Sequence, residues 1–367
     1  MKIALVVGAR PNFMKVGPIY FELKKHSRYT LLLIHTGQHY DDNLSKIFFT
    51  QLGFPEPDVY LGVGSGTHGV QTAKIMIAFE QFLLQEKPDL VLVAGDVNST
   101  VACAIDAVKL HIPVAHLEAG LRSFDRRMPE EINRIATDCI SDLLLTPSND
   151  ANENLINEGV STNRIFLVGN AMIDSLLSFE KKAEQTKTLE RLQLKKGFYG
   201  LITLHRPSNV DNKESLEMIL NAFSEIAVNL PLIFPMHPRT RKQISAFGLE
   251  EKVNSISNLK LIDSVGYLDF IKLEKYAKLV LTDSGGIQEE TTVFGVPCLT
   301  LRENTERPIT IEYGTNQLVD LNKEAIVHNV NQILDGKIKK GRIPPLWDGH
   351  TAERVVKVMD EFHYTFT

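Results

Sequence analysis

Three acidic residues stand where short hydrophobic runs stop or a helix begins, and their positions predict acid–base chemistry. Asp96 follows LVLVAG, Glu118 ends PVAHLE, and Glu130 begins EEINR. An acid at a helix start can simply stabilise the helix dipole, and Glu130 could pair with Arg134 four residues on. Asp96 and Glu118 have no such local explanation, and an acid that faces a binding site loses hydration. Beside a bound phosphate, such carboxylates could move protons on the attached group.

A second group of residues predicts a phosphate site. The sequence SGG at 284–286 lies between a hydrophobic run and a helical run, where backbone N–H groups can approach an anion closely. A tight turn explains these glycines equally well. Either Glu289 or Glu290 could accept hydrogen bonds from ribose hydroxyls, or both could only stabilise the helix dipole. The cations available for a pyrophosphate are Arg10 and Lys15 in GARPNFMK and Arg307 in NTERP.

Two histidines and one arginine also follow hydrophobic runs. His205 follows YGLITL, His237 follows PLIFPM and Arg302 follows PCLTL. The histidines are candidates for phosphate contact or proton transfer, although one histidine at a strand end is more often structural. GSGTHG at 64–69 matches the dinucleotide pattern, but that pattern has meaning only after a strand, and the residues before it form a poor one. This argues against an NAD-dependent dehydrogenase.

Short hydrophobic runs alternate with amphipathic stretches along the chain, which predicts an α/β protein with parallel sheets. The runs are 2–8, 30–36, 90–95, 113–119, 143–146 and 165–169, then 199–205, 231–237, 259–262, 278–282 and 297–301. A mixed-charge stretch at 181–196 separates the two sets. We expect doubly wound Rossmann-like domains at 1–170 and 171–349. Ligands bind beyond the carboxyl ends of parallel strands, so the polar residues there should line a cleft.

The composition is that of an ordinary globular protein, with 43% hydrophobic and 23% charged residues in a chain of 367. A formal net charge of -5 argues against a nucleic-acid partner. The three cysteines (Cys103, Cys139 and Cys298) are far apart, which fits no metal site and favours a reducing compartment. The sequence shows no signal peptide and no run of about 18 apolar residues, so we expect a cytoplasmic protein without a membrane span.

Motifs along the whole chain resemble those of the non-hydrolysing UDP-N-acetylglucosamine 2-epimerases. The matching stretches are GARPNFMK (8–15), TGQH (36–39), AGDVNST (94–100), HLEAGLRSFDRRMPEEINR (116–134), TLHRPSNVDN (203–212), MHPRT (236–240), TDSGGIQEE (282–290), LRENTERP (301–308) and DGHTAERVV (348–356). The fourth and seventh together are far more specific than one glycine motif. The resemblance implies a GT-B architecture, with two Rossmann-like domains facing across a cleft and a C-terminal helix at about 350–364 returning to the first.

The resemblance also implies a homodimer that reversibly converts UDP-N-acetylglucosamine to UDP-N-acetylmannosamine, with neither NAD nor a metal. UDP would be eliminated across C1–C2 to leave 2-acetamidoglucal, and then added back with a proton delivered to the other face. By motif match, the acid–base residues are Asp96, Glu118 and Glu130, with His205 near the sugar and pyrophosphate. The nucleotide-binding residues by the same match are Arg10, Lys15, Ser284, Gly285, Gly286 and Arg307 for the pyrophosphate, Glu290 for the ribose and Phe270 for the uracil.

One motif departs from the family pattern. Bacterial members commonly place an arginine after the Gln-His pair, at a site where a second substrate molecule activates the enzyme, and this chain has Tyr40 there. Gln38 and His39 remain candidates for a regulatory site.

Four alternatives to this activity stay open. They are a hydrolysing epimerase, an epimerase for a modified sugar such as a diacetamido uronic acid nucleotide, a GT-B glycosyltransferase, and a nucleotide-sugar sensor. The intact carboxylate set argues against the sensor. A transferase needs an acceptor site, and the sequence shows no basic or amphipathic stretch suited to a membrane-bound acceptor.

Overall fold

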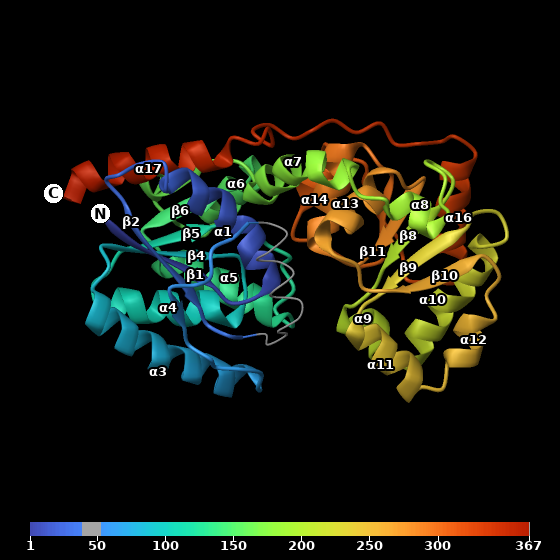
Figure 1. Ribbon diagram of the computed structural model, residues 1–367, viewed down its shortest axis with the longest axis horizontal. Coiled ribbons are helices and arrows are strands. Elements are labelled where there is room, and N and C mark those ends of the chain that lie inside the picture. Colours follow the sequence, from blue (N-terminus) through green and yellow to red (C-terminus); the bar gives the residue numbers. More distant parts are fainter. Residues whose placement is uncertain (39–52, 367) are drawn as a thin grey trace. The chain divides into compact units, whose positions relative to one another are not determined.

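The computed structural model describes residues 1–38 and 53–366. The chain divides into two compact units: Met1–Ser178 together with the segment from Pro345 onward, and Phe179–Pro344. Each unit is a parallel β-sheet with helices on both of its faces (Figure 1). This confirms the predicted α/β class with two doubly wound parallel-sheet domains.

The sheet of the first unit is built around hydrophobic runs from the first half of the chain. Its strands are β1 (Lys2–Val7), β2 (Thr30–His35), β3 (Val59–Tyr60), β4 (Leu90–Ala94), β5 (Val114–Leu117), β6 (Leu143–Thr146) and β7 (Ile165–Leu167). Across the described residues the order is β3-β2-β1-β4-β5-β6-β7. Every residue of β4, β5 and β6 is buried, which is why these strands read as continuous hydrophobic runs. The strand order reverses between β1 and β4, where open α/β sheets bind their ligands.

The second sheet repeats this plan. Its strands are β8 (Gly200–Thr203), β9 (Leu232–Met236), β10 (Leu259–Asp263), β11 (Leu279–Thr282), β12 (Cys298–Thr300) and β13 (Asn316–Leu318). In the described chain they run in the order β10-β9-β8-β11-β12-β13, all parallel, and the order reverses between β8 and β11. Thr203 lies opposite Thr282 in this register, and their hydroxyls are 2.6 Å apart.

Helices cover the sheet of the first unit, and one of them belongs to the C-terminal segment that returns to this unit. They are α1 (Arg10–Leu23), α3 (His68–Glu86), α4 (Asn98–Lys109), α5 (Pro129–Ile140), α6 (Asn149–Asn157) and α17 (Thr351–Phe366), with a 3-10 turn at Thr162–Arg164. Helix α17 lies beside α1 (Figure 1). The Trp347 indole donates a hydrogen bond to the Pro147 carbonyl (3.0 Å), and Arg28 pairs with Asp360 of α17 (2.6 Å).

Helix α7 (Ala171–Glu184) crosses the division between the units, which falls after Ser178. The remaining helices are α8 (Thr188–Leu192), α9 (Pro207–Val210), α10 (Lys213–Ile226), α11 (Pro238–Ala246), α12 (Glu250–Asn254), α13 (Tyr267–Lys275), α14 (Gly285–Phe294), α15 (Pro308–Glu312) and α16 (Lys323–Leu334). On α10, Leu216, Ile219 and Phe223 are fully buried at helical spacing, so this amphipathic face supplies part of the second core.

The sequence analysis missed two strands, β3 and β13. Both are edge strands of two or three residues, and neither has a hydrophobic run of the length that identifies a central strand. No helix in the described residues is long and apolar enough to cross a membrane.

Candidate functional site

The first unit places Glu118 and Lys15 together where its strand order reverses. Glu118 follows β5, Lys15 lies on α1, and the Lys15 ammonium donates directly to a Glu118 carboxylate oxygen. Both residues are more than nine-tenths buried. Gly95, which follows β4, makes room for this pair, because a Cβ atom there would lie 2.7 Å from Lys15 Nζ. The glycine of the AGD motif therefore serves the contact between a cation and a carboxylate.

The backbone of Glu118 is in the left-handed region, with φ of 72°. A non-glycine residue there costs roughly 1–3 kcal/mol and persists only where the surroundings impose it. Buried His116 lies two residues earlier, 2.6 Å from Asp138 Oδ1 through Nδ1 and 2.8 Å from the Gly95 carbonyl through Nε2. Asp138 Oδ2 then accepts the Gly120 N–H (3.0 Å). The turn that carries Glu118 is thus fixed on both sides.

Burial alone would raise the pKa of Asp138, but His116 and Arg122 outweigh it and hold that pKa below its ordinary value. Arg122 donates to Asp138 (2.7 Å) and also to Glu158 (2.7 Å). Asp138 is therefore the charged centre of a buried network that supports the turn around Glu118.

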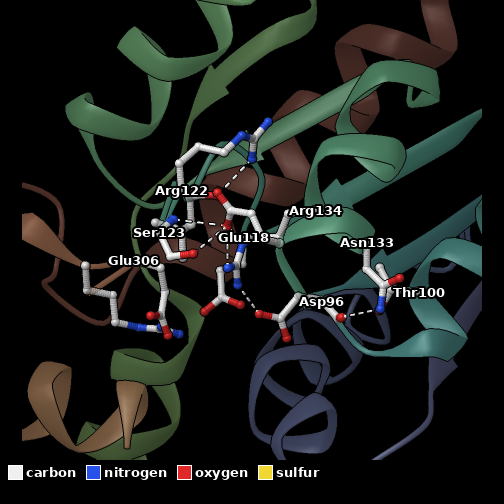
Figure 2. Close-up of polar contacts among 12 residues, drawn as sticks. Asp96, Thr100, Glu118, Arg122, Ser123, Asn133, Arg134 and Glu306 are labelled. Carbon is white, nitrogen blue, oxygen red and sulfur yellow. Dashed lines mark hydrogen bonds and ion pairs between the residues drawn. The ribbon is translucent and has the colours of Figure 1, made fainter. Parts of the chain in front are cut away.

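Asp96 follows β4 and is held by a buried arginine. Arg134 of α5 is only 2% exposed; it donates to the Asp96 carboxylate, and Asn133 donates to the Asp96 carbonyl (2.9 Å), as Figure 2 shows. Arg134 also donates a hydrogen bond through Nη2 to Oε2 of Glu131 (2.6 Å). The Asp96 side chain keeps 26% of its surface exposed, so a ligand can reach it.

Glu130 differs from its neighbour Glu131. Glu131 is buried, accepts the N–H groups of Ser123 (3.0 Å) and Phe124 (2.8 Å), and has a lowered pKa because these bonds and Arg134 outweigh burial. Glu130 is half-buried and makes no hydrogen bond or ion pair with any residue that the structure describes. Arg134 pairs with Glu131 and Asp96, so the pairing of Glu130 with Arg134 that the sequence allowed does not form.

In the second unit, His205 follows β8 and Asp283 follows β11, again where the strand order reverses. Asp283 is fully buried, and its Oδ1 lies 2.9 Å from His205 Nδ1. It also accepts the N–H groups of His205 (3.0 Å) and Arg206 (2.9 Å). Burial would raise the pKa of Asp283, but His205 and these N–H groups outweigh it and lower that pKa. The His205 side chain is 36% exposed, so its Nε2 is the ring nitrogen left for a ligand.

The SGG sequence is a helix start, as the sequence analysis expected. Ser284 is the N-cap of α14, and Gly285 and Gly286 form its first turn. A Cβ atom on Gly285 would lie 2.4 Å from Arg307 Nη1, so glycine lets this guanidinium reach the positive end of the helix. Arg307 donates to Glu289 (2.8 Å) and Glu306 (2.5 Å). A helix start with a guanidinium beside it suits an anion.

Two more arginines adjoin Arg307 through Glu306. Glu306 is 2% exposed and accepts from Arg302 (2.8 Å), while Arg206 Nη2 lies 3.6 Å away. These three arginines outweigh burial and hold the pKa of Glu306 far below its ordinary value. Arg302 Nη1 and Arg206 Nε are buried without an acceptor among the described residues. The carboxylates of Glu289 and Glu306 thus hold three guanidinium groups together in this unit.

The remaining nucleotide-binding residues predicted from sequence lie on two helices of the second unit. Glu290 of α14 is 3% exposed and accepts the Tyr267 hydroxyl of α13 (2.7 Å). Phe270, also on α13, is half-buried and packs against a hydrophobic cluster. His237 begins α11, where its Nδ1 accepts the Arg239 N–H (3.2 Å), so this histidine has the structural role of a cap.

The structure describes no side chain for two of the predicted residues, Arg10 and His39. Arg10 begins α1, and only its backbone is described. His39 lies outside the described residues. Its neighbour Gln38 is buried, and its side-chain oxygen accepts the Ser99 N–H (3.0 Å) and hydroxyl (2.7 Å) at the start of α4. The described residues contain no group of three or more His, Cys, Asp or Glu suited to a metal ion.

Sequence reasoning missed the residues that hold the site together. They are His116, Arg122, Asp138, Glu131 and Arg134 in the first unit, with Asp283, Arg206 and Glu306 in the second. Most of them stand inside the motifs already noted, and their charge was the available signal. Their partners are tens of residues away in several cases, as for His116 with Asp138 and His205 with Asp283.

Comparisons with known proteins show which family this chain resembles. The family model described as UDP-N-acetylglucosamine 2-epimerase matches residues 21–360. A relative of that name from Methanocaldococcus jannaschii is 47% identical over 98% of this chain and 99% of its own length. The UDP-2,3-diacetamido-2,3-dideoxy-D-glucuronate 2-epimerase of Pseudomonas aeruginosa is 44% identical over 92% of this chain and 94% of its own.

The solved structures support the fold as well. The crystal structure of the M. jannaschii UDP-GlcNAc 2-epimerase in complex with UDP-GlcNAc and UDP matches with a TM-score of 0.92 and 46% identity, covering 98% of this chain and all of that one. A structure of the Neisseria meningitidis UDP-GlcNAc 2-epimerase bound to UDP-GlcNAc has a TM-score of 0.89 and 28% identity, covering 98% of this chain and all of that one. These matches confirm the predicted GT-B class.

Proposed function

The chain belongs to the UDP-N-acetylglucosamine 2-epimerase family, and on that premise we propose that it interconverts UDP-N-acetylglucosamine and UDP-N-acetylmannosamine without hydrolysis. The observation that carries the proposal is the pair of carboxylates in the first unit, Asp96 and Glu118. Each is held by a buried cation, Arg134 or Lys15, and each stands where an α/β sheet binds its ligand.

The proposed reaction avoids a proton abstraction that would be very difficult. The hydrogen on C2 of the sugar is not adjacent to a carbonyl group, so its removal needs a leaving group on the next carbon. One carboxylate takes the C2 proton, the C1–O bond breaks, and UDP departs with the bonding electrons. A double bond forms between C1 and C2, giving 2-acetamidoglucal. Protonation of C2 on the opposite face and return of UDP to C1 give the epimer.

Residues of the first unit would move the protons. The Lys15 ammonium donates to the Glu118 carboxylate and fixes its position after β5. Asp96 is the more accessible carboxylate, and Glu130 has no structural partner in the described chain, so both are open to the sugar. Together these three carboxylates would serve both faces of the sugar.

Residues of the second unit would bind UDP and stabilise it as a leaving group. The negative charge that develops on the pyrophosphate would meet the helix start at Ser284, Gly285 and Gly286, together with Arg307 and the exposed nitrogen of His205. Arg10 of the first unit is assigned to the same charge. Glu290 would accept the ribose hydroxyls, and Phe270 would border the uracil.

The proposal includes a cytoplasmic homodimer that acts without NAD or a metal and binds neither nucleic acid nor membrane. An exposed row on α3 supports the dimer: Val70, Ile77 and Leu84 recur every seven residues and are 51%, 63% and 57% exposed. Light scattering of the purified protein tests this. A monomer at micromolar concentration would contradict it.

The test of the reaction is incubation with UDP-N-acetylglucosamine in deuterated water, followed by NMR. We expect UDP-N-acetylmannosamine with deuterium at C2. Free N-acetylmannosamine with stoichiometric UDP would instead identify a hydrolysing enzyme. The P. aeruginosa relative favours a second candidate, a diacetamido uronic acid nucleotide. No exchange into UDP-N-acetylglucosamine, with exchange into that sugar, would identify it.

A further inference from the structure

One buried carboxyl group in the second unit is not used by the proposed mechanism. Glu274 lies near the end of α13 and is fully buried. No N–H or O–H donor among the described residues reaches either of its side-chain oxygens. Within the described chain, the group that approaches it is another carboxyl group, that of Glu290 on α14. Two ionised carboxylates cannot share a buried contact, so such a pair retains a proton.

Among the residues that the structure describes, no cation is near enough to Glu274 to replace that proton. Besides Glu290, the titratable group that faces it is the thiol of Cys298, which burial keeps neutral by raising its pKa to about 11. The lysines of α13 are engaged elsewhere: Lys272 and Lys275 both bind Glu184 (3.0 and 2.6 Å). Burial first, and then Glu290, raise the pKa of Glu274 well above its ordinary value.

The contact with Glu290 matters because Glu290 is the residue assigned to the ribose. Tyr267 and Glu274 are seven residues apart on α13, so they share a helix face, and both reach the Glu290 carboxylate. A carboxylate has about four acceptor sites. The Tyr267 hydroxyl and a protonated Glu274 would occupy two of them. A protonated Glu274 would thus help Tyr267 to orient the Glu290 carboxylate.

We propose that Glu274 is a positioning residue that stays protonated, donates its hydrogen bond to Glu290, and so holds Glu290 ionised and oriented for the two ribose hydroxyls of UDP. This rests on the proposed function, because it assumes that Glu290 binds the ribose. The two carboxyl groups then carry one negative charge between them. Loss of the shared proton at alkaline pH would place two negative charges in contact and disturb the carboxylate that UDP needs.

The first experiment measures UDP affinity by calorimetry from mildly acidic to alkaline pH. We expect the wild-type affinity to fall about tenfold on the alkaline side relative to E274Q, whose amide keeps the donor but cannot titrate. Titration of UDP itself is common to both proteins and cancels in this ratio. D106N is the matched control: Asp106 is a buried carboxyl group in the first unit, and this variant should follow the wild type. The same alkaline profile in E274Q and wild type would overturn the proposal.

The second experiment observes the proton directly and does not depend on UDP binding. The infrared difference spectrum between the wild type and E274Q at neutral pH should contain the carbonyl stretch of a neutral carboxylic acid. Burial raises the pKa of Asp106 to about 7, but the band of Asp106 is common to both proteins and cancels in this difference. The absence of a carboxylic acid band from the difference spectrum at neutral pH would overturn the proposal.

The two experiments separate this inference from the proposed function. E290Q should bind UDP about tenfold more weakly at every pH, because it loses the charged acceptor. If E290Q binds UDP as the wild type does, the assignment of Glu290 to the ribose is wrong. The infrared band would then still report whether Glu274 holds a proton.

Discussion

The ligand-binding ends of the two sheets are built alike and charged in opposite senses. In the first unit, buried cations (Lys15 and Arg134) hold the carboxylates proposed to react. In the second, buried carboxylates (Asp283 and Glu306) hold a histidine and three arginines. The same strand order thus supports the proposed bases in one unit and the proposed anion site in the other. The strand order determines where in each unit the functional groups lie. The buried residue that pairs with each group determines whether a carboxylate or a cation faces the ligand.

The sharpest test of this comparison is Glu118→Gln. Removal of the carboxylate should lower turnover by about 10²–10⁴-fold, because proton transfer loses its base, while UDP affinity stays within about twofold of the wild type. Steady-state kinetics and calorimetry measure the two effects. Turnover near that of the wild type would show that Glu118 does not react. A large loss of UDP affinity would show that the charge of the first unit also binds the nucleotide.

Asp283→Asn tests the opposite arrangement, in which a buried carboxylate holds a cationic partner. We expect kcat to fall about 10–100-fold. Residues that orient a metal-binding histidine contribute about that much, and Asp283 orients His205 through the same kind of hydrogen bond. The pH profile of kcat should also change, since Asp283 contacts His205 directly. If the variant has a lower free energy of unfolding than the wild type but the same pH profile of kcat, Asp283 acts only in folding. Asp211→Asn is the control, because Asp211 is an aspartate of the same unit that pairs with a cationic residue, Arg239, on the surface.

Arg307→Met should weaken UDP binding by roughly 10-fold, because a charged hydrogen-bond donor is lost from the helix start. Raising the salt concentration should reduce the difference between the variant and the wild type. Calorimetry at two ionic strengths measures this. An affinity within twofold of the wild type at low salt would remove Arg307 from the pyrophosphate site. Arg241→Met, which breaks a surface pair with Asp263, provides the matched control.

The smallest expected effect concerns the pH dependence of folding. The folded-state pKa of Glu274 lies above its unfolded value of 4.5, so the folded protein binds more protons once the pH exceeds that value. Stability from this group is therefore fully present below the unfolded pKa and is lost as the pH rises towards the folded pKa. Relative to E274Q, the free energy of unfolding of the wild type should fall by up to about 1.4 kcal/mol per pH unit in this range. Parallel denaturation curves for both proteins would contradict it.

The strands were predictable from the sequence where they are buried on both faces. The run LVLVA reads as a strand because all five residues of β4 face the core. Strands β3 and β13 were missed because a two- or three-residue edge strand has neither a long hydrophobic run nor a clear alternation. The positions of Asp96, Glu118, His205 and Ser284 after strands followed from the same runs.

The supports of the site could not be predicted in the same way. The sequence shows that His116 and Asp138 exist, but their contact depends on how α5 packs against β5. The left-handed backbone of Glu118 is likewise set by tertiary contacts, since no local residue preference requires φ of 72° at a glutamate. The Glu274–Glu290 pair conflicts with the simple rule that acids are exposed, and only the packing of α13 on α14 shows it.

The route of the chain has a consequence for the order of folding. The second unit is inserted into the first, because the chain leaves the first unit after Ser178 and returns to it at Pro345. On the ribosome, the whole second unit is therefore synthesised before α17 can cover α1, and before Asp174 can accept the Thr351 and Ala352 N–H groups (3.2 and 2.8 Å). Until then, the apolar surface that α17 covers is exposed, and we expect the nascent first unit to be open to aggregation and to chaperone binding at that surface.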